Sequence, residues 1–498
     1  MKAGRGREKV LSLPGCKGRV QNMKLSQLMK GLDVIDTNGE LEIEGITCDS
    51  RRVKPGWAFV CIEGTAADGH DFAEKAAQDG ADLVVAQRDL GLDCQLLVPS
   101  TRRAWARMSA NWFGNPADKL HLVGITGTNG KTSTTYMLKA IMEACGYKVG
   151  LIGTIQNMIG ERVLPAGHTT PDPYDLQSML ALMAAEGCTY AVMEVSSHAL
   201  DQDRVEGCTF DAAVFTNLTQ DHLDYHKTME NYLAAKKRLF TMCRTGIVNM
   251  DDEWSRQLTE GLGCRLVTYS AGNDEADYTA RNIRGRADGV DFELVGTGVI
   301  GRVRLGIPGD FSVYNALAAA SCALTLGMPF AKVVDALSAA PGVKGRAEIV
   351  PTGRDFTVVI DYAHTPDGLQ NICETMKKCT EGRLITVFGC GGDRDKGKRP
   401  KMGAIAAALS DYLVITSDNP RTEEPGAIIQ DILEGLQGSK TPYTVIENRP
   451  EAIRWAVAHA KPGDTVLLAG KGHETYQILH TGIIHLDERE VVAEALKE

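Results

Sequence analysis

The stretch HLVGITGTNGKTSTTYMLKAIMEAC, residues 121–145, decides the fold of this chain. Its first five residues are apolar and β-prone, and the next five are small, polar and rich in glycine. From Lys131 onward, apolar side chains recur at helical spacing. A strand, a glycine-rich turn and a helix in this order form a phosphate cradle, because the turn exposes backbone N–H groups and the helix start adds its dipole. Lys131 supplies a positive charge, and Thr132 or Ser133 can ligate Mg²⁺.

This cradle is shorter than the common P-loop. The common pattern has a glycine five residues before Gly130, where this chain has Ile125, so only GxxGKT remains. A plain strand–turn–helix without a ligand is the alternative interpretation. The Lys-Thr pair at the helix start argues against it, and the stretch therefore predicts a nucleotide-binding domain.

Length and composition exclude several classes of protein. A chain of 498 residues is too long for one core, and we expect about three domains. The net charge of −10 argues against a nucleic-acid partner, whose phosphates need a basic face. No apolar run approaches the ~18–20 residues of a membrane helix, so no membrane insertion is expected. The 13 cysteines lack metal-site spacing, which favours reduced thiols in a cytoplasmic protein. The protein is also expected to be a monomer.

The rhythm of strands and helices divides the chain into four parts. Residues 1–22 are basic and glycine-rich without an apolar core, which predicts a flexible N-terminal extension rather than a secretory signal. Residues 23–115 read as a small α/β domain, residues 116–344 as the nucleotide domain and residues 345–498 as a further α/β domain. The predicted fold class is α/β, with three domains, a central P-loop-type parallel sheet and a Rossmann-like C-terminal domain.

Individual elements follow from the periodicity of apolar residues. Residues 41–48 are a strand candidate in the first domain. In the central domain, residues 229–240 and 315–326 are expected to be helices, and residues 265–306 a β-ribbon. In the last domain, strands are expected at 356–360, 384–388, 412–416, 444–447 and 465–469. Most of these strands run into polar loops, so ligands are expected at the carboxyl edges of the sheets.

Several residues at strand ends could carry chemistry. Glu194 ends a buried-type strand, where a carboxylate can hold Mg²⁺. His222 lies among acids in QDHLDYH, which indicates a metal or phosphate role. Lys236 follows two alanines in an amphipathic helix, and the pattern alone places it on a solvated face.

Three arginines stand on strand-end loops of the last domain: Arg394, Arg399 and Arg421. Each alone would most often be a solvated charge. Arginine binds carboxylates bidentately, which suits recognition of an amino acid. The nearby acids Asp418, Glu423 and Glu474 would suit the ammonium group of the same zwitterion.

Taken together, the motifs GTNGKTS, TTPD, EVSSHAL, TNLTQDHLDYH, AAKKRLF, GRAE, DYAHTPD, FGCGGDRDKGKRP, DNPRTEEP and AGKGHETYQ resemble, in this order, the Mur ligases. The resemblance covers about residues 23–498. It implies one domain for a UDP-sugar substrate, one ATPase domain and one domain for an incoming amino acid. In this family ATP phosphorylates a carboxylate to an acyl phosphate, which the amine of the amino acid attacks. Such chemistry needs phosphate clamps and metal ions rather than a protein nucleophile.

The resemblance assigns the ATP site and the catalytic residues. Asn315, Arg346 and Asp361 match family residues that contact adenine, phosphate and ribose. Lys236 matches the lysine that reacts with CO₂ to form a carbamate, a role that reverses the solvated-face interpretation. The implied ATP-binding residues are Gly127, Thr128, Asn129, Gly130, Lys131, Thr132, Ser133, Asn315, Arg346 and Asp361. The implied catalytic residues are Lys131, Glu194, His222 and Lys236. The implied Mg²⁺ ligands are Thr132, Glu194, His222 and carbamylated Lys236.

The resemblance also assigns the sugar-dipeptide site, for UDP-MurNAc-L-Ala-D-Glu. His168 stands where some members have Asn, and Thr65-Ala66 stands where some have His-Gln. The implied binding residues are Cys48, Ser50, Thr65, Ala66, Ala67, His168, Thr169, Thr170, Ser196, Gln202 and Arg204.

The loop DNPR, residues 418–421, resembles the form found in members that add meso-diaminopimelate, whereas lysine-adding members lack this arginine. Diaminopimelate carries an additional carboxylate at its far end, which Arg421 could bind in a bidentate manner. The implied diaminopimelate site comprises Arg394, Asp418, Asn419, Pro420, Arg421, Gly470 and Glu474.

Other ligases remain as alternatives, namely a lysine-adding member of the family or an enzyme like folylpolyglutamate synthase, which shares the cradle. The DNPR loop and a full N-terminal domain with the motif DSRR argue against the second. A GTPase or kinase would need the longer loop and a base-reading motif, and neither is found in the sequence.

Overall fold

The computed structural model describes residues 22–34, 40–64, 67–286 and 289–497. Apart from Asn22, the predicted N-terminal extension lies outside these residues, as do Thr65 and Ala66. The chain divides into two compact units, of which unit 1 holds the residues up to Val123 together with Tyr147–Asp211. Unit 2 holds Gly124–Gly146 and Ala212–Glu498. The division passes through strands β7 (His121–Thr126) and β12 (Phe210–Phe215).

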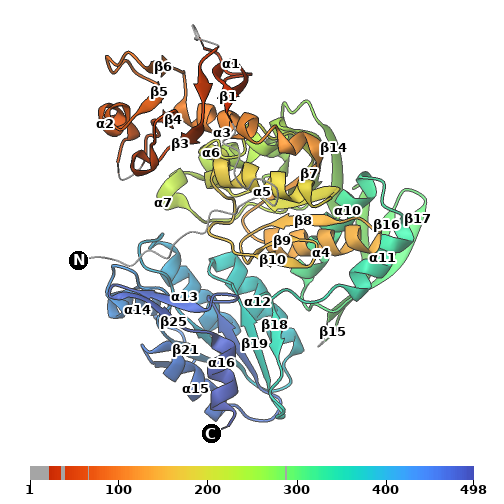
Figure 1. Cartoon of the computed structure of the whole chain (residues 1–498). Helices are drawn as coiled ribbons and strands as arrows, with labels where there is room; N and C mark the ends of the chain where they lie inside the picture. Colours follow the sequence, from red (N-terminus) through yellow and green to blue (C-terminus); the bar gives the residue numbers. More distant parts are fainter. Residues whose placement is uncertain (1–21, 35–39, 65–66, 287–288, 498) are drawn as a thin grey trace. The chain divides into compact units, whose positions relative to one another are not determined.

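Unit 1 begins with a parallel sheet of β3 (Gly45–Thr47), β4 (Trp57–Val60), β5 (Ala81–Ala86) and β6 (Gln95–Leu97). Alternate residues of β4 and β5 face opposite sides, as the twofold period of a strand requires. Val60 and Val85 pack against α3 (Thr101–Trp112), whereas Phe59 and Val84 pack against α2 (Ala73–Gln78). Figure 1 shows this small α/β layer in red and orange.

The single strand expected at residues 41–48 is wrong. The structure has β2 (Glu42–Ile43) and β3 instead. Ile43 pairs with Met23 of β1 (Met23–Lys24) in a small antiparallel sheet, while Gly45 pairs with Trp57 in the parallel one. The chain changes sheets at Glu44, which the apolar pattern did not reveal.

The remainder of unit 1 supplies strand ends for a second site. β8 (Val149–Ile152) pairs in parallel with β11 (Tyr190–Glu194), and β9 (Asn157–Ile159) and β10 (Arg162–Leu164) form a hairpin beside β8. The helices α5 (Pro173–Ala185) and α6 (Ser197–Asp201) follow β10 and β11 along the chain.

Unit 2 contains the phosphate loop. Helix α4 (Lys131–Ala144) packs on α10 (Asp310–Thr325) and α11 (Phe330–Ala339), and α10 covers β13 (Cys243–Asn249) and β14 (Arg265–Ser270). The β-ribbon predicted at residues 265–306 is confirmed for the antiparallel strands β15 (Tyr278–Arg286), β16 (Gly289–Gly296) and β17 (Val299–Leu305). Its first part is instead β14, which pairs in parallel with β13 and β15. The helix predicted from residue 315 begins earlier, at Asp310.

Residues 345–498 form a six-stranded sheet in the order β18-β19-β23-β20-β21-β22. All neighbours are parallel except β18 (Glu348–Val350). The five predicted strands are confirmed as β19 (Thr357–Asp361), β20 (Leu384–Phe388), β21 (Tyr412–Ile415), β22 (Tyr443–Val445) and β23 (Thr465–Ala469). One face packs against α12 (Pro366–Cys379), α13 (Lys398–Leu409) and α14 (Pro425–Glu434), and the other against α15 (Arg449–His459) and α16 (Glu488–Ala495). Because β19, β20, β21 and β23 are parallel, the polar loops that follow them leave the same edge of the sheet.

Candidate active site

The phosphate loop turns on two glycines with positive φ. Gly127 has φ +152° and Gly130 has φ +83°, which L side chains rarely adopt. A Cβ at Gly127 would collide with the Thr216 hydroxyl, and one at Gly130 with the Asn315 amide oxygen. Thr216 Oγ1 also donates to the carbonyl of Asn129 at 2.6 Å. The loop is therefore shaped by unit 2 itself, and Asn315 lies against it as the predicted ATP site requires.

Two lysines meet at this loop. Lys131 Nζ donates to the carbonyls of Gly127 and Thr128, both at 2.8 Å, and Lys236 Nζ donates to the Gly127 carbonyl, also at 2.8 Å. Lys236 is only 1% exposed and lies 4.3 Å from the centre of the Tyr232 ring. Burial, and then the charge of Lys131, lower the pKa of Lys236 well below its ordinary range. The solvated position expected from the pattern is wrong, because α8 (Met229–Lys237) packs beneath the loop.

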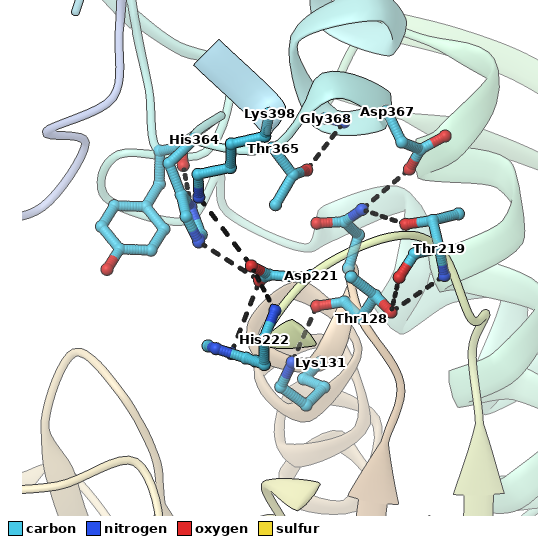
Figure 2. Close-up of polar contacts among 12 residues, drawn as sticks. Thr128, Lys131, Thr219, Asp221, His222, His364, Thr365, Asp367, Gly368 and Lys398 are labelled. Carbon is cyan, nitrogen blue, oxygen red and sulfur yellow. Dashed lines mark hydrogen bonds and ion pairs between the residues drawn. The ribbon is translucent and has the colours of Figure 1, made fainter. Parts of the chain in front are cut away.

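The motif around His222 meets residues from the last third of the chain (Figure 2). His222 has φ +55°, and its Nε2 lies 3.4 Å from Asp221 Oδ2. Asp221 is buried, with Lys398 Nζ and His364 Nε2 each 3.8 Å from its carboxylate. Burial alone would raise the pKa of Asp221, but the positive charges of His222 and Lys398 hold it below its usual range. Sequence reasoning named Asp221 only as one of the acids beside His222, and it assigned no role to His364 or Lys398.

Further contacts join the phosphate loop and the start of α4 to residues after 345. Asn129 Nδ2 donates to Asp367 Oδ2 at 2.8 Å, and Arg346 donates to Thr132 Oγ1 at 3.2 Å. Asp361, at the end of β19, accepts the backbone N–H groups of Ala347 and Ala363. A cavity of about 450 Å³ lies beside Arg346, lined by residues 306–308, 342–344 and 346–349. Its volume is within the range of small-molecule pockets, and the structure places the predicted ATP residues Arg346 and Thr132 in contact.

Within unit 1, Glu194 and part of the sugar-dipeptide set form one hydrogen-bonded group. The fully buried Glu194 carboxylate accepts the backbone N–H and the hydroxyl of Thr154, at 2.8 and 2.9 Å. A Cβ at Gly153 would meet this carboxylate, which explains the glycine. Thr154 Oγ1 lies 3.0 Å from Thr169 Oγ1, and the Thr170 hydroxyl donates to the Glu194 carbonyl.

The same group extends to the residues that follow β11. Thr170 Oγ1 accepts the backbone N–H of Ser196 at 3.0 Å, and Arg204 donates to the Thr170 carbonyl and to Gln202 Oε1. The structure thus brings together Thr169, Thr170, Ser196, Gln202 and Arg204, as the resemblance implied. The sugar-dipeptide roles of Cys48, Ser50, Ala67 and His168 stay predictions, and Thr65 and Ala66 lie outside the described residues.

The residues predicted to bind the incoming amino acid lie on the loops after β20, β21 and β23. Arg421 has φ +54° and donates to the carbonyls of Gly392 and Asn419, at 2.9 and 3.3 Å. Burial, and then the neighbouring Arg394 guanidinium, lower the pKa of Arg421. Within the described residues, neither Arg394 nor Arg421 has a carboxylate within ion-pair distance. A guanidinium group without an ion-pair partner is of the kind that binds a carboxylate, which is the role predicted for these two arginines.

The rest of the predicted amino-acid site adjoins these arginines. Gly470 has φ +117°, and a Cβ there would contact Asp418 Oδ2. Asn419 donates to Glu474 at 2.9 Å. The Arg421 guanidinium packs so closely on Gly391 that a Cβ on that residue would lie against it. The structure thereby brings Asp418 to Gly470, and Asn419 to both Arg421 and Glu474.

Arg399 differs from the other two arginines. Its side chain is 1% exposed and donates to both carboxylate oxygens of Glu423, at 2.9 and 3.0 Å, and to Asp431 at 2.7 Å. The solvated position expected for a lone arginine is therefore wrong for Arg399, and its charge is compensated within the fold. Arg399 instead braces α13, on which it lies, against α14 and the loop before α14.

The Arg399–Glu423 pair predicts a pH-dependent stability. Hydrogen bonds from Arg399 lower the pKa of Glu423 to about 2, whereas an unfolded glutamate titrates near about 4.3. Because the folded pKa is depressed, this contribution is full above about pH 4.3 and is lost as the pH falls towards 2. R399M should lower the free energy of unfolding by about 3 kcal/mol at pH 7, measured by urea denaturation. The difference from wild type should shrink as the pH falls from about 4.3 towards 2; a constant difference would contradict the assignment.

The described residues contain no group of three His, Cys, Asp or Glu side chains arranged to hold a metal. Magnesium keeps several waters and uses one or two protein carboxylates together with substrate phosphates, so it does not need such a group. The hydroxyl of Thr132 and the carboxylate of Glu194 are oxygen donors of the kind it prefers, and they fit this ion. In the same described part of the chain, no helix is both long and apolar enough to cross a membrane.

Comparison with known families gives three consecutive matches. Residues 42–104 match "Mur ligase family, catalytic domain", residues 125–323 match "Mur ligase middle domain", and residues 345–472 match "Mur ligase, glutamate ligase domain".

Two similar proteins cover nearly the whole chain. UDP-N-acetylmuramoyl-L-alanyl-D-glutamate--2,6-diaminopimelate ligase of Caldanaerobacter subterraneus is 50% identical, over 96% of this chain and 99% of that one. The corresponding ligase 1 of Clostridium acetobutylicum is 47% identical, over 96% and 100%.

Solved structures agree with these relatives. A structure of an enzyme with the first of these names has a TM-score of 0.70, with 31% identity over 96% of this chain and 99% of that chain. Folylpolyglutamate synthase of Mycobacterium tuberculosis has a TM-score of 0.58, with 19% identity over 74% and 92%, a likeness of fold alone.

Proposed function

Because this chain belongs to the Mur ligase family, we propose that it is an ATP-dependent ligase that joins meso-diaminopimelate to UDP-MurNAc-L-Ala-D-Glu. The bond forms at the γ-carboxylate of the D-Glu residue, in the synthesis of the peptidoglycan precursor. A cytoplasmic location and a monomeric state stay predictions.

The observation that carries the choice of amino acid is the state of Arg421. Its guanidinium is held in place by backbone carbonyls and meets no carboxylate among the described residues. Diaminopimelate brings a carboxylate at its far end, and lysine brings an ammonium group, which the charges of Arg421 and Arg394 would repel. The carboxylates of Glu474 and Asp418 lie nearby for the ammonium group of the same zwitterion.

The reaction divides into two steps. The γ-carboxylate oxygen attacks the γ-phosphorus of ATP, and ADP leaves, which yields an acyl phosphate. The amine of the amino acid then attacks the acyl carbon, phosphate leaves with the C–O bond electrons, and the ammonium proton passes to solvent or to a nearby base. Backbone N–H groups of the loop and Lys131 bind phosphate oxygens, and Arg346 reaches Thr132 from the C-terminal sheet. Asn315 and Asp361 are proposed to contact adenine and ribose.

The metal assignments are proposals carried by the family. Thr132, Glu194, His222 and Lys236 as its carbamate are proposed as ligands of Mg²⁺. When bound, Mg²⁺ would offset the negative charge of the phosphate groups in both steps. Burial lowers the pKa of Lys236, which favours the neutral amine that a reaction with CO₂ requires and so supports the carbamate.

The sugar-dipeptide site is proposed in unit 1, on the residues named from the family. The hydrogen-bonded group of Thr169, Thr170, Ser196, Gln202 and Arg204 supports this assignment. Cys48, Ser50, Thr65, Ala66, Ala67 and His168 stay predictions from the resemblance.

Phosphate release from ATP tests the proposed function. With the purified enzyme and Mg²⁺, release should require UDP-MurNAc-L-Ala-D-Glu and meso-diaminopimelate together, and omission of either should reduce it to background. The nucleotide product should be ADP, since the γ-phosphate is transferred. Release that proceeds without the amino acid, or with a folate and glutamate instead, would refute the proposal.

A further inference from the structure

A fully buried lysine lies within the proposed amino-acid site. Lys471 follows β23, and its side chain is 0% exposed. An isolated buried ammonium group is costly, so its partners matter. Its Nζ donates to Glu474 Oε2 at 2.6 Å and to Asn419 Oδ1 at 2.9 Å, and it lies 5.3 Å from the centre of the Tyr476 ring. Lys471 therefore joins the loop after β21 to the loop after β23.

The hydrogen bonds fix the orientation of the Asn419 amide. Its Oδ1 accepts from both Lys471 Nζ and the backbone N–H of Ile478, and its Nδ2 donates to Glu474 Oε2 at 2.9 Å. A flipped amide would point its NH₂ group at two donors, which is unfavourable. Lys471, Asn419 and Glu474 thus form a closed triangle of hydrogen bonds.

This triangle leaves one oxygen of Glu474 available. Oε2 accepts two hydrogen bonds, from Lys471 and Asn419, whereas Oε1 accepts none from the residues that the structure describes. The hydrogen bond from Lys471 orients Oε2 of Glu474 towards Lys471 and Asn419, and Oε1 stays available for a cationic group. The carbonyl of Asn419 also accepts from Arg421, so the position of the triangle is transmitted to that guanidinium.

We propose that Lys471 is a positioning residue for the amino-acid substrate, which orients Glu474 Oε1 towards the substrate ammonium and holds Asn419 beneath Arg421. This inference rests on the proposed function, because it assumes an amino acid at this site. Without the Lys471 ammonium, Glu474 and Asn419 lose a shared donor, and Glu474 can rotate away from the orientation that the substrate needs.

K471M tests this role, since methionine has a similar length and no charge. KM for meso-diaminopimelate should rise about 10- to 100-fold, the range expected for a charge-assisted hydrogen bond, with KM for ATP within about threefold of wild type. In the N419A background, K471M should add less than about threefold, because both act on Glu474. If K471M does not fold, K471Q, which keeps a hydrogen-bond donor but lacks the charge, should raise KM for diaminopimelate in the same selective way.

R383M is a matched control. Arg383 forms an ion pair with Asp464, which directly precedes β23. Lys471 forms its ion pair with Glu474 just after β23, so the two pairs lie at opposite ends of the same strand. R383M should lower thermal stability without changing KM for diaminopimelate. A folded K471M with unchanged KM, an equal rise of KM for all three substrates, or full additivity with N419A would overturn the inference. Absence of diaminopimelate-dependent turnover in wild type would instead refute the proposed function.

Discussion

Replacing Arg421 by alanine should lower kcat/KM for meso-diaminopimelate by about 30- to 1,000-fold, the cost of removing one partner of a desolvated charge pair. KM for ATP should stay within about twofold of wild type, because Arg421 touches no residue of the phosphate loop. The guanidinium is half-buried and held by the carbonyls of Gly392 and Asn419, so it is already placed before a substrate arrives. Steady-state kinetics with each substrate varied in turn measure both effects.

R454A is the matched control for this variant. Arg454 belongs to the same sheet domain but forms a surface pair with Glu494 on α16. Its removal should leave the fold intact, since surface pairs contribute little to stability. All three KM values should therefore stay unchanged. Equal losses for diaminopimelate and ATP in R421A would show that Arg421 supports the fold rather than the choice of amino acid.

Replacing Lys236 by alanine should lower kcat by about 100- to 1,000-fold, a loss typical for a group that stabilises developing charge. K236R should be as inactive as K236A, because a guanidinium does not form the carbamate. Lys236 is buried against the Tyr232 ring, and its Nζ reaches the Gly127 carbonyl of the phosphate loop. Turnover should also fall when bicarbonate and CO₂ are removed from the buffer, and recover when they are restored.

The neighbouring Lys237 provides the control. Its Nζ donates to the Gln257 carbonyl at 3.1 Å and to the Glu260 carbonyl, away from the loop. K237A should therefore keep its activity and its dependence on bicarbonate. A large loss in K237A together with an active K236A would assign the carbamate to the other lysine.

Most of the fold could be predicted because its signals are local. The five parallel strands after residue 345 are short apolar runs bounded by polar loops, and the structure has all five within three residues of the predicted ends. The glycines at 127 and 130 predicted the phosphate turn, because their backbone angles require glycine. The end of one strand at Glu44 was not predictable, since the change of sheet depends on tertiary pairing.

The site was predicted less completely, because burial of charge is a tertiary property. The sequence cannot tell that Arg399 is neutralised by Glu423 and Asp431 while Arg421 is not. Nor does the periodicity of α8 reveal that Lys236 lies under the phosphate loop. Lys471 and Lys398 stand in recognisable motifs, and only the structure shows their partners, Glu474 and Asp221.

The charged side chains on the strand-end loops fall into two classes, according to whether they have a carboxylate partner in the fold. Arginines and lysines with carboxylate partners in the fold, such as Arg399 and Lys471, shape the loops. Arg394 and Arg421 meet no carboxylate within ion-pair distance in the described residues, and we propose that they bind the substrate. This distinction yields opposite expectations for R399M, which should lose stability, and R421A, which should lose a substrate.

A competition between meso-diaminopimelate and L-lysine tests the central claim most directly. The wild-type enzyme receives both amino acids at equal concentration, with ATP, Mg²⁺ and UDP-MurNAc-L-Ala-D-Glu, and the two tripeptide products are quantified by mass spectrometry. Since lysine leaves Arg421 without a carboxylate, the diaminopimelate product should exceed the lysine product by about 100-fold or more. Lysine product in equal or greater amount would contradict the account.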